Sequence, residues 1–204
     1  SGAWGEDGWN ERHAPIDFFD GKGVVERLLG ELRITKVRFK PCDPEAFGWL
    51  QPGRAAEVYA AGELLGWVGS VHPLALANFG ISSDVVAFEL SEPHLLRLAR
   101  HELPYEDVPA LPATTIDLAV VVDEDVTCET LTQRITSAGG KLLESARLFD
   151  VYRDPIRVGV GKKSMAFKLT YRAADHTLTS EEVERAQARL VKKVCGSTGA
   201  EVRG

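Results

Sequence analysis

The second half of the chain alternates between strand-like and helix-like spacing of its apolar residues. Residues 117–123 (DLAVVVD) form a valine-rich run between acidic residues, which is typical of a central strand. The next stretch, 127–138, repeats apolar residues at helical spacing: Cys128, Leu131, Ile135 and Ala138. We expect this helix to end at Gly139-Gly140, with Gly139 as its left-handed cap.

Two extended segments and a second helix follow. Residues 142–152 and 164–172 have strand character, and in the second of them Met165, Phe167, Leu169 and Tyr171 alternate with more polar residues. Thr179 and Glu182 form a capping box before a helix, and 200–203 fit a short last strand. The order β-α-β-β-α-β predicts a ferredoxin-like antiparallel sheet with both helices on one face.

The other face of such a sheet stays open, and RNA-recognition modules of this topology stack bases on aromatic residues there. The candidate aromatics are Phe149, Tyr152, Phe167 and Tyr171. The spaced aromatic signature of an RNA-recognition motif is missing, and we expect Phe149 and Phe167 to pack in the core.

The first half predicts an antiparallel α+β element. A helix is expected over 18–29, strands over 35–39, 55–60, 64–71 and 85–90, and a short helix over 93–100. The stretch 103–112 (LPYEDVPALP) holds three prolines and predicts a linker. We therefore expect two domains, 1–106 and 107–204, in an α+β chain.

Charge is distributed unevenly. Residues 1–106 carry 10 basic and 16 acidic side chains, and residues 107–204 carry 14 of each. Within the neutral half, 147–172 holds seven basic and two acidic side chains. Such a local excess is the electrostatic footprint of a polyanion-binding protein, although a solvated loop and strand edge explain the charge alone equally well.

The sequence contains no complete catalytic or metal-binding motif. Gly159-Val-Gly-Lys-Lys-Ser164 is not a Walker A loop, because strand rather than helix spacing follows it. The three cysteines have no CxxC spacing, and there is neither an HExxH nor a GxSxG motif. The acidic run 123–125 fits a solvated turn better than a cation site. We expect no catalytic and no metal-binding residues in this chain, and a cytoplasmic rather than a membrane protein, because no apolar run has membrane-spanning length.

Several strings occur together in one order: DFFDGKG (17–23), QPGRAAEVYAAGELLGWVGSVHP (51–73), VAFELS (86–91), LPATTIDLAVVVDEDV (111–126), GGKLLESARLFDVY (139–152) and GKKSMAFKLTYRAADHTLTSEEV (161–183). In this order they resemble the C-terminal part of the β subunit of bacterial phenylalanyl-tRNA synthetase. Two positions depart from the family pattern. Gln51 replaces the usual histidine, and Thr115-Ile116 stands where the family commonly has arginine, so Ile116 is not an expected RNA contact.

The resemblance implies that 1–106 is the tail of a non-catalytic class II synthetase-like module and that 107–204 is a ferredoxin-fold anticodon-binding domain. It also implies an α subunit as partner in an (αβ)₂ heterotetramer, tRNA(Phe) as ligand, and ATP and magnesium as requirements of the whole enzyme rather than of this region. The region itself is expected to bind and scaffold without catalysing.

The expected mechanism is docking of the anticodon stem-loop on the basic stretch. Lys162 and Lys163 are placed in a loop, with Arg153 and Arg157 before it, and unpaired bases stack on Tyr152. The full expected set is Arg147, Tyr152, Arg153, Arg157, Lys162, Lys163, Lys168 and Arg172. The alternative is a protein-interaction module for assembly without direct RNA contact, which would bind its partner with little dependence on salt.

Overall fold

A computed structural model describes residues 1–3, 15–100 and 111–203 of this chain. The chain divides into two compact units, Ser1–Tyr105 and Glu106–Gly204, which we describe separately. Most of the expected linker 103–112 lies outside the described residues, which resume at Leu111.

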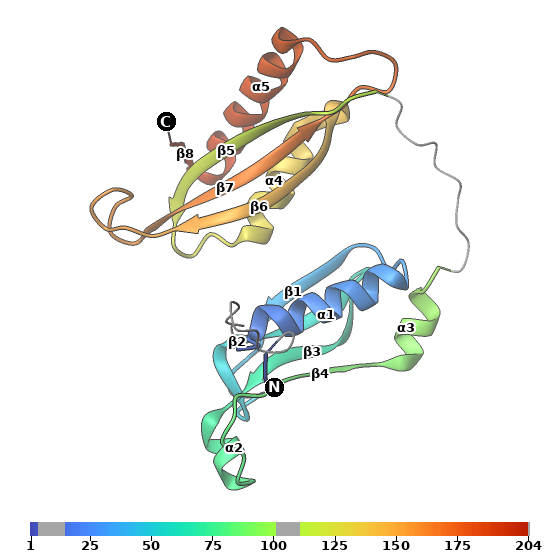
Figure 1. Ribbon diagram of the computed structural model, residues 1–204, viewed down its shortest axis with the longest axis vertical. Helices are drawn as coiled ribbons and strands as arrows, with labels where there is room; N and C mark the ends of the chain where they lie inside the picture. Colours follow the sequence, from blue (N-terminus) through green and yellow to red (C-terminus); the bar gives the residue numbers. More distant parts are fainter. Residues whose placement is uncertain (4–14, 101–110, 204) are drawn as a thin grey trace, which may run out of the picture. The chain divides into compact units, whose positions relative to one another are not determined.

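The first unit is built on a four-stranded antiparallel sheet (Figure 1). Its strands lie in the order β1 (Val37–Pro41), β2 (Leu50–Ala60), β3 (Glu63–Val71) and β4 (Val86–Leu90). Three helices accompany the sheet, namely α1 (Phe18–Glu31), α2 (Pro73–Asn78) and α3 (Glu92–Leu98). All the strands and helices expected in this half are present; α2 is additional.

Helix α1 covers one face of this sheet. Its buried residues Val25 and Leu29 belong to the same apolar cluster as Val58 and Val68 of β2 and β3. The helix approaches the sheet closely at Gly21, where a Cβ atom would overlap the side chain of Val86. Glycine is therefore required at this point by packing and not by backbone conformation.

Helix α2 begins at a proline and is capped by the preceding histidine. His72 Nδ1 accepts a hydrogen bond of 3.2 Å from the backbone N–H of Leu74. A helix of six residues is too short to show helical periodicity, so the apolar pattern does not predict it. His72 therefore has a structural role as the cap of this helix.

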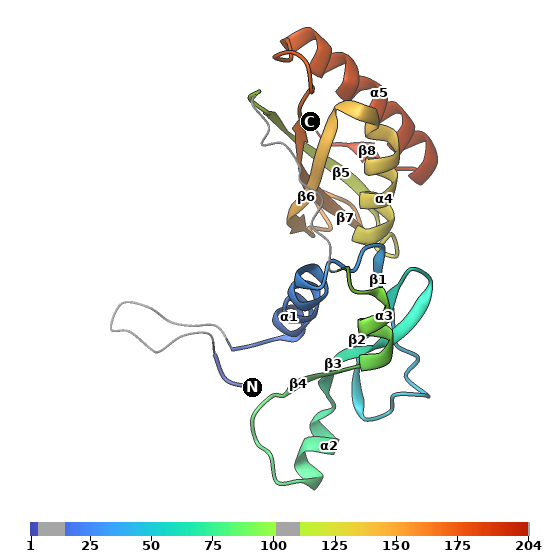
Figure 2. The same ribbon diagram turned by 90° about the vertical axis from the view of Figure 1, so that its right-hand side faces the viewer.

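The second unit has the expected ferredoxin-like topology. Its elements follow one another as β5 (Thr114–Asp123), α4 (Cys128–Gly139), β6 (Leu143–Tyr152), β7 (Lys162–Tyr171), α5 (Ser180–Thr198) and β8 (Glu201–Val202). The sheet order is β6-β7-β5-β8, with every neighbouring pair antiparallel. Figures 1 and 2 show both helices on the same side of this sheet.

The core of the second unit lies between the two helices and the sheet. Leu131 and Ile135 of α4 and Leu190 of α5 pack with alternate residues of β5 and β7, including Phe167. Phe167 is fully buried, as expected. The capping box at Thr179 and Glu182 is also confirmed, since each side chain bonds the backbone N–H of the other.

One helix end differs from the expectation. Gly139 has right-handed helical dihedrals and is the last residue of α4, whereas Gly140 carries the positive φ of 67°. The chain then makes a short 3-10 turn (Gly140–Leu142) before β6. Gly139 is instead required by packing, because a Cβ there would overlap the side chain of Leu143.

Candidate nucleic-acid interface

The face of the second sheet that the helices do not cover is the candidate interface. Cross-strand pairing places side chains from neighbouring strands side by side on this face: Arg147 with Lys168, Asp150 with Ala166, and Tyr152 with Ser164. On the same face, β7 also pairs with β5, which places Lys168 beside Asp117 and Ser164 beside Val121. We call this surface the open face; it carries cations, carboxylates and small residues along three strands.

A β-bulge between Leu148 and Asp150 decides which β6 side chains reach the open face. The extra residue is Phe149, whose ring is 54% exposed and whose centroid lies 5.8 Å from the ammonium nitrogen of Lys168. The expectation that Phe149 packs in the core is therefore wrong. A bulge has no marker in the spacing of this strand, so alternation alone could not assign the side chain.

Arg147 and Lys168 form the exposed cationic part of the open face. Both side chains are exposed, and their backbones are direct neighbours on β6 and β7. No ion pair of Arg147 is found within the described part of the chain.

Tyr152 lies at the end of β6 in a polar network. Its hydroxyl donates a hydrogen bond of 2.8 Å to Asp154 Oδ2, which raises the pKa of the phenol. The same bond, together with the backbone N–H groups of Arg157 and Ile156, lowers the pKa of Asp154. The guanidinium of Arg203 lies 5.0 Å from the Tyr152 ring centroid. The ring is thus held in a fixed orientation and only partly buried.

Arg203 was not among the expected site residues. Its backbone N–H bonds Ala119 O at 2.9 Å, which continues the β8–β5 pairing by one residue and directs its side chain across the sheet toward Tyr152. The sequence predicts a last strand over 200–203 that contains Arg203, but it does not show which strand pairs with it.

Two of the residues expected to contact RNA, Arg153 and Lys163, bond Glu124 in this structure. Arg153 donates to both oxygens of Glu124 at 2.7–3.1 Å, and this lowers the pKa of Glu124. Lys163 donates to the backbone carbonyl of Glu124 at 2.7 Å and is only 8% exposed. The placement of Lys162 and Lys163 in a loop is wrong, because both begin β7. The strand extends further than its apolar alternation because β5 pairs with it up to Lys162.

The remaining expected residues lie at the ends of the same strands. Lys162 Nζ is 3.7 Å from a carboxylate oxygen of Glu201, and Arg172 Nε is 2.8 Å from Glu144. Arg157 is exposed and follows β6. The structure thus brings Arg147, Tyr152 and Lys168 together on the open face and distributes the other five around its ends.

The described residues contain no cluster of three or more potential metal ligands, and the three cysteines are free and half-buried. Among the described residues no helix is both long and apolar enough to cross a bilayer.

A four-stranded antiparallel sheet with two helices on one face and an open opposite face defines a ferredoxin-fold domain. Residues 109–203 match the family model of the ferredoxin-fold anticodon binding domain. Residues 1–91 match the model of the phenylalanyl-tRNA synthetase β chain CLM domain. The chain belongs to the phenylalanyl-tRNA synthetase β-chain family.

Relatives in several bacteria agree with this assignment. The chain is 43% identical over 196 residues to the phenylalanine–tRNA ligase β subunit of Symbiobacterium thermophilum, covering 96% of this chain and 21% of that protein. It is 38% identical over 205 residues to the β subunit of Bacillus licheniformis and 37% identical to that of Bacillus subtilis, covering all of this chain and 25% of each relative. The chain therefore spans about a fifth to a quarter of these relatives.

Proposed function

We propose that this chain is part of a phenylalanine–tRNA ligase and that residues 107–204 bind the anticodon stem-loop of tRNA(Phe). The observation that carries the proposal is the open face, where Arg147, Lys168 and Tyr152 lie on adjacent strands. The family match supports the class of ligand, because the matched domain is named for anticodon binding.

The proposed mechanism combines positioning by charge with stacking. Arg147 and Lys168 contact phosphates of the loop. Lys162 and Arg172 contribute at the ends of the strands after exchanging their carboxylate partners for phosphate, and Arg157 contributes from the segment that follows β6. Arg153 and Lys163 keep their hydrogen bonds to Glu124 and so stabilise the start of β7. The open face also carries Asp117 and Asp150, whose carboxylates repel phosphates. They therefore disfavour any position of the RNA that places a phosphate beside them.

Tyr152 is the proposed stacking residue. Stacking of a base on an aromatic ring is worth about 1–3 kcal/mol in single-strand binders. Its hydrogen bond to Asp154 holds the ring before RNA arrives, so little side-chain entropy is lost on binding. Arg203 lies against the ring, where its charge is available to the phosphate of a stacked nucleotide.

The first unit is proposed to be the C-terminal part, residues 1–106, of the non-catalytic class II synthetase-like module. Helix α1 buries Val25 and Leu29 but leaves Phe19 73% exposed and Val24 39% exposed. Such apolar surface is suited to the α subunit or to upstream parts of the β chain. The (αβ)₂ assembly and the use of ATP and magnesium by the whole ligase belong to the same proposal, as does a cytoplasmic location.

The test is a titration of the chain with the anticodon stem-loop of tRNA(Phe) and with a scrambled-loop control at several salt concentrations. We expect tighter binding to the native loop, with an affinity that falls linearly on a log–log plot against salt. The double variant Arg147→Ala, Lys168→Ala should reduce that slope by about 0.7–0.9 for each lost phosphate contact.

Arg134→Ala is the matched control, because Arg134 is an exposed cation on α4, on the helix side of the sheet. It should leave affinity and slope unchanged. Equal binding of both loops, or an unchanged slope in the double variant, would exclude the open face as the anticodon reader. Salt-independent binding to an α subunit without RNA binding would support the assembly module instead.

A further inference from the structure

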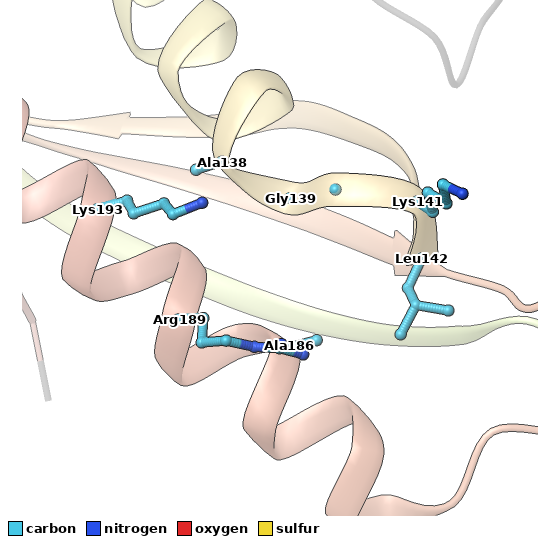
Figure 3. A pocket seen from close by; sticks show the side chains of 8 residues that line it. Ala138, Gly139, Lys141, Leu142, Ala186, Arg189 and Lys193 are labelled. Atoms are coloured by element: carbon cyan, nitrogen blue, oxygen red, sulfur yellow. The ribbon is translucent and has the colours of Figure 1, made fainter.

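The second unit has a cavity on its helix side, away from the open face. It has a volume of about 200 Å³ and lies between the C-terminal end of α4 and the middle of α5. Figure 3 shows Lys193 extending from α5 toward Ala138, and Lys141 on the segment that follows α4. The cavity is separate from every residue of the proposed anticodon surface.

The charges around this cavity are all of one sign. Lys141, Arg189 and Lys193 line it, and no lining residue is acidic. Within the described part of the chain, none of these three cations has a carboxylate within ion-pair distance. Arg153, Lys163 and Arg172 of the same unit are each paired. Three like charges around one concave site raise the local positive potential, which attracts anions.

The geometry leaves donors free for such an anion. Arg189 uses its Nε to bond Arg185 O at 3.2 Å, and its two terminal nitrogens have no protein partner among the described residues. The opposite wall consists of small residues, Ala138 and Gly139, which allow close approach. The carbonyl end of α4 contributes about half a negative charge, which three full positive charges outweigh.

We propose that this cavity binds a small phosphomonoester through Arg189, Lys193 and Lys141. A phosphomonoester carries a charge of about −1.5 to −2 at neutral pH, whereas a phosphodiester carries one charge, so the monoester matches the three cations better. The cavity has the volume of several water molecules at about 30 Å³ each, enough for a phosphate group with part of its hydration. The planar guanidinium of Arg189 supplies two parallel donors to one phosphate edge.

The test follows backbone amide signals of the 204-residue chain by NMR during titration with inorganic phosphate at constant ionic strength set by chloride. We expect saturable shifts confined to the segments 138–142 and 186–193. Ribose 5-phosphate should cause the same shifts, and dimethyl phosphate, a singly charged diester, should bind at least about tenfold more weakly.

The double variant Arg189→Gln, Lys193→Gln should weaken phosphate binding at least about tenfold. Lys192→Gln removes an exposed cation of the same helix that does not line the cavity, and it should bind as the wild type does. All three side chains are exposed, so the variants should keep the dispersion of the wild-type spectrum. Absence of saturable shifts, or equal binding by the double variant, would overturn the site. Equal binding of dimethyl phosphate would overturn the assignment to monoesters in favour of a phosphodiester backbone.

Discussion

Lys162 and Lys163 are adjacent in the sequence and have opposite roles in the structure. The side chain of Lys162 is 37% exposed beside Glu201, while that of Lys163 is 10% exposed and bonded to Glu124. Successive residues of a strand point to opposite sides, so one lysine is placed at the open face and the other beneath the turn that precedes α4. Both lysines add equally to the net charge, but only Lys162 is exposed to solvent.

Replacement of Lys163 by methionine should therefore reduce stability, because it leaves the carbonyl of Glu124 without its charged donor. The expected loss is about 1–2 kcal/mol, measured by urea denaturation. Lys162→Met is the control and should change stability by less than about 0.5 kcal/mol, since exposed ion pairs contribute little. Equal losses in the two variants would contradict the assigned roles.

At the scale of elements, two of the three glycines of helix α1, Gly21 and Gly23, differ in their surroundings. A Cβ at Gly21 would overlap Val86, and a Cβ at Gly23 would meet nothing within 4 Å. Gly21 permits the close packing of the helix on β4, whereas Gly23 only weakens the helix.

Gly21→Ala should accordingly destabilise the first unit by about 1–3 kcal/mol through overpacking. Gly23→Ala should stabilise it by about 0.5–1 kcal/mol, because alanine loses less backbone entropy in a helix. Thermal melting of both variants, followed by circular dichroism, measures the difference. Two shifts of the same sign would show that α1 is not fixed against Val86.

The start of α5 carries a pH-sensitive contact. His176 bonds Asp175 at 2.8 Å through Nδ1 and Glu182 at 3.2 Å through Nε2, and these bonds raise its pKa. Glu182 also accepts bonds from the backbone N–H and hydroxyl of Thr179, which lower its own pKa. The carboxylate therefore stays charged while the histidine titrates.

Since the folded pKa of His176 lies above its unfolded value of 6.5, the contact stabilises fully below pH 6.5 and is lost as pH rises through the folded value. Near pH 5.5, about one unit below the unfolded pKa, we expect the wild type to have a higher melting temperature than the His176→Gln variant. The two melting temperatures should become equal in mildly alkaline buffer. A difference that stays constant across this range would show that the histidine acts only by packing or by neutral hydrogen bonds.

The sequence predicted these elements well where the signal was local. The Thr179–Glu182 box is present as expected, and the helix that follows it buries Val183, Ala186, Leu190 and Val194. The errors arose where a partner strand decided the outcome: β7 begins earlier because β5 pairs with it, and Phe149 turns outward at a bulge. Arg203 reaches Tyr152 across two intervening strands, and no spacing within its own strand reveals that contact.

At the scale of the whole molecule, the described residues form two hydrophobic cores, one in each unit. All four tryptophans lie within residues 1–105, at positions 4, 9, 49 and 67. Tryptophan fluorescence therefore reports on the first unit, and far-ultraviolet circular dichroism reports on both.

Leu190→Ala, in the second core, should destabilise that unit by about 2–5 kcal/mol and leave the fluorescence midpoint in urea unchanged. Leu29→Ala, in the first core, should lower the fluorescence midpoint. Coincident shifts of both probes in both variants would show that the two units unfold as one cooperative block.

The bulge in β6 has a further consequence for how this domain tolerates changes in length. Because the bulge adds one residue, Tyr152 pairs with Ser164 on the open face and Val151 with Met165 on the core side. Deleting a single residue from 148–150 would exchange these two orientations from there to the end of the strand, directing the valine outward and the tyrosine inward. Loss of one codon here would thus leave the later residues of the strand unchanged in sequence but move each of their side chains to the opposite face of the sheet.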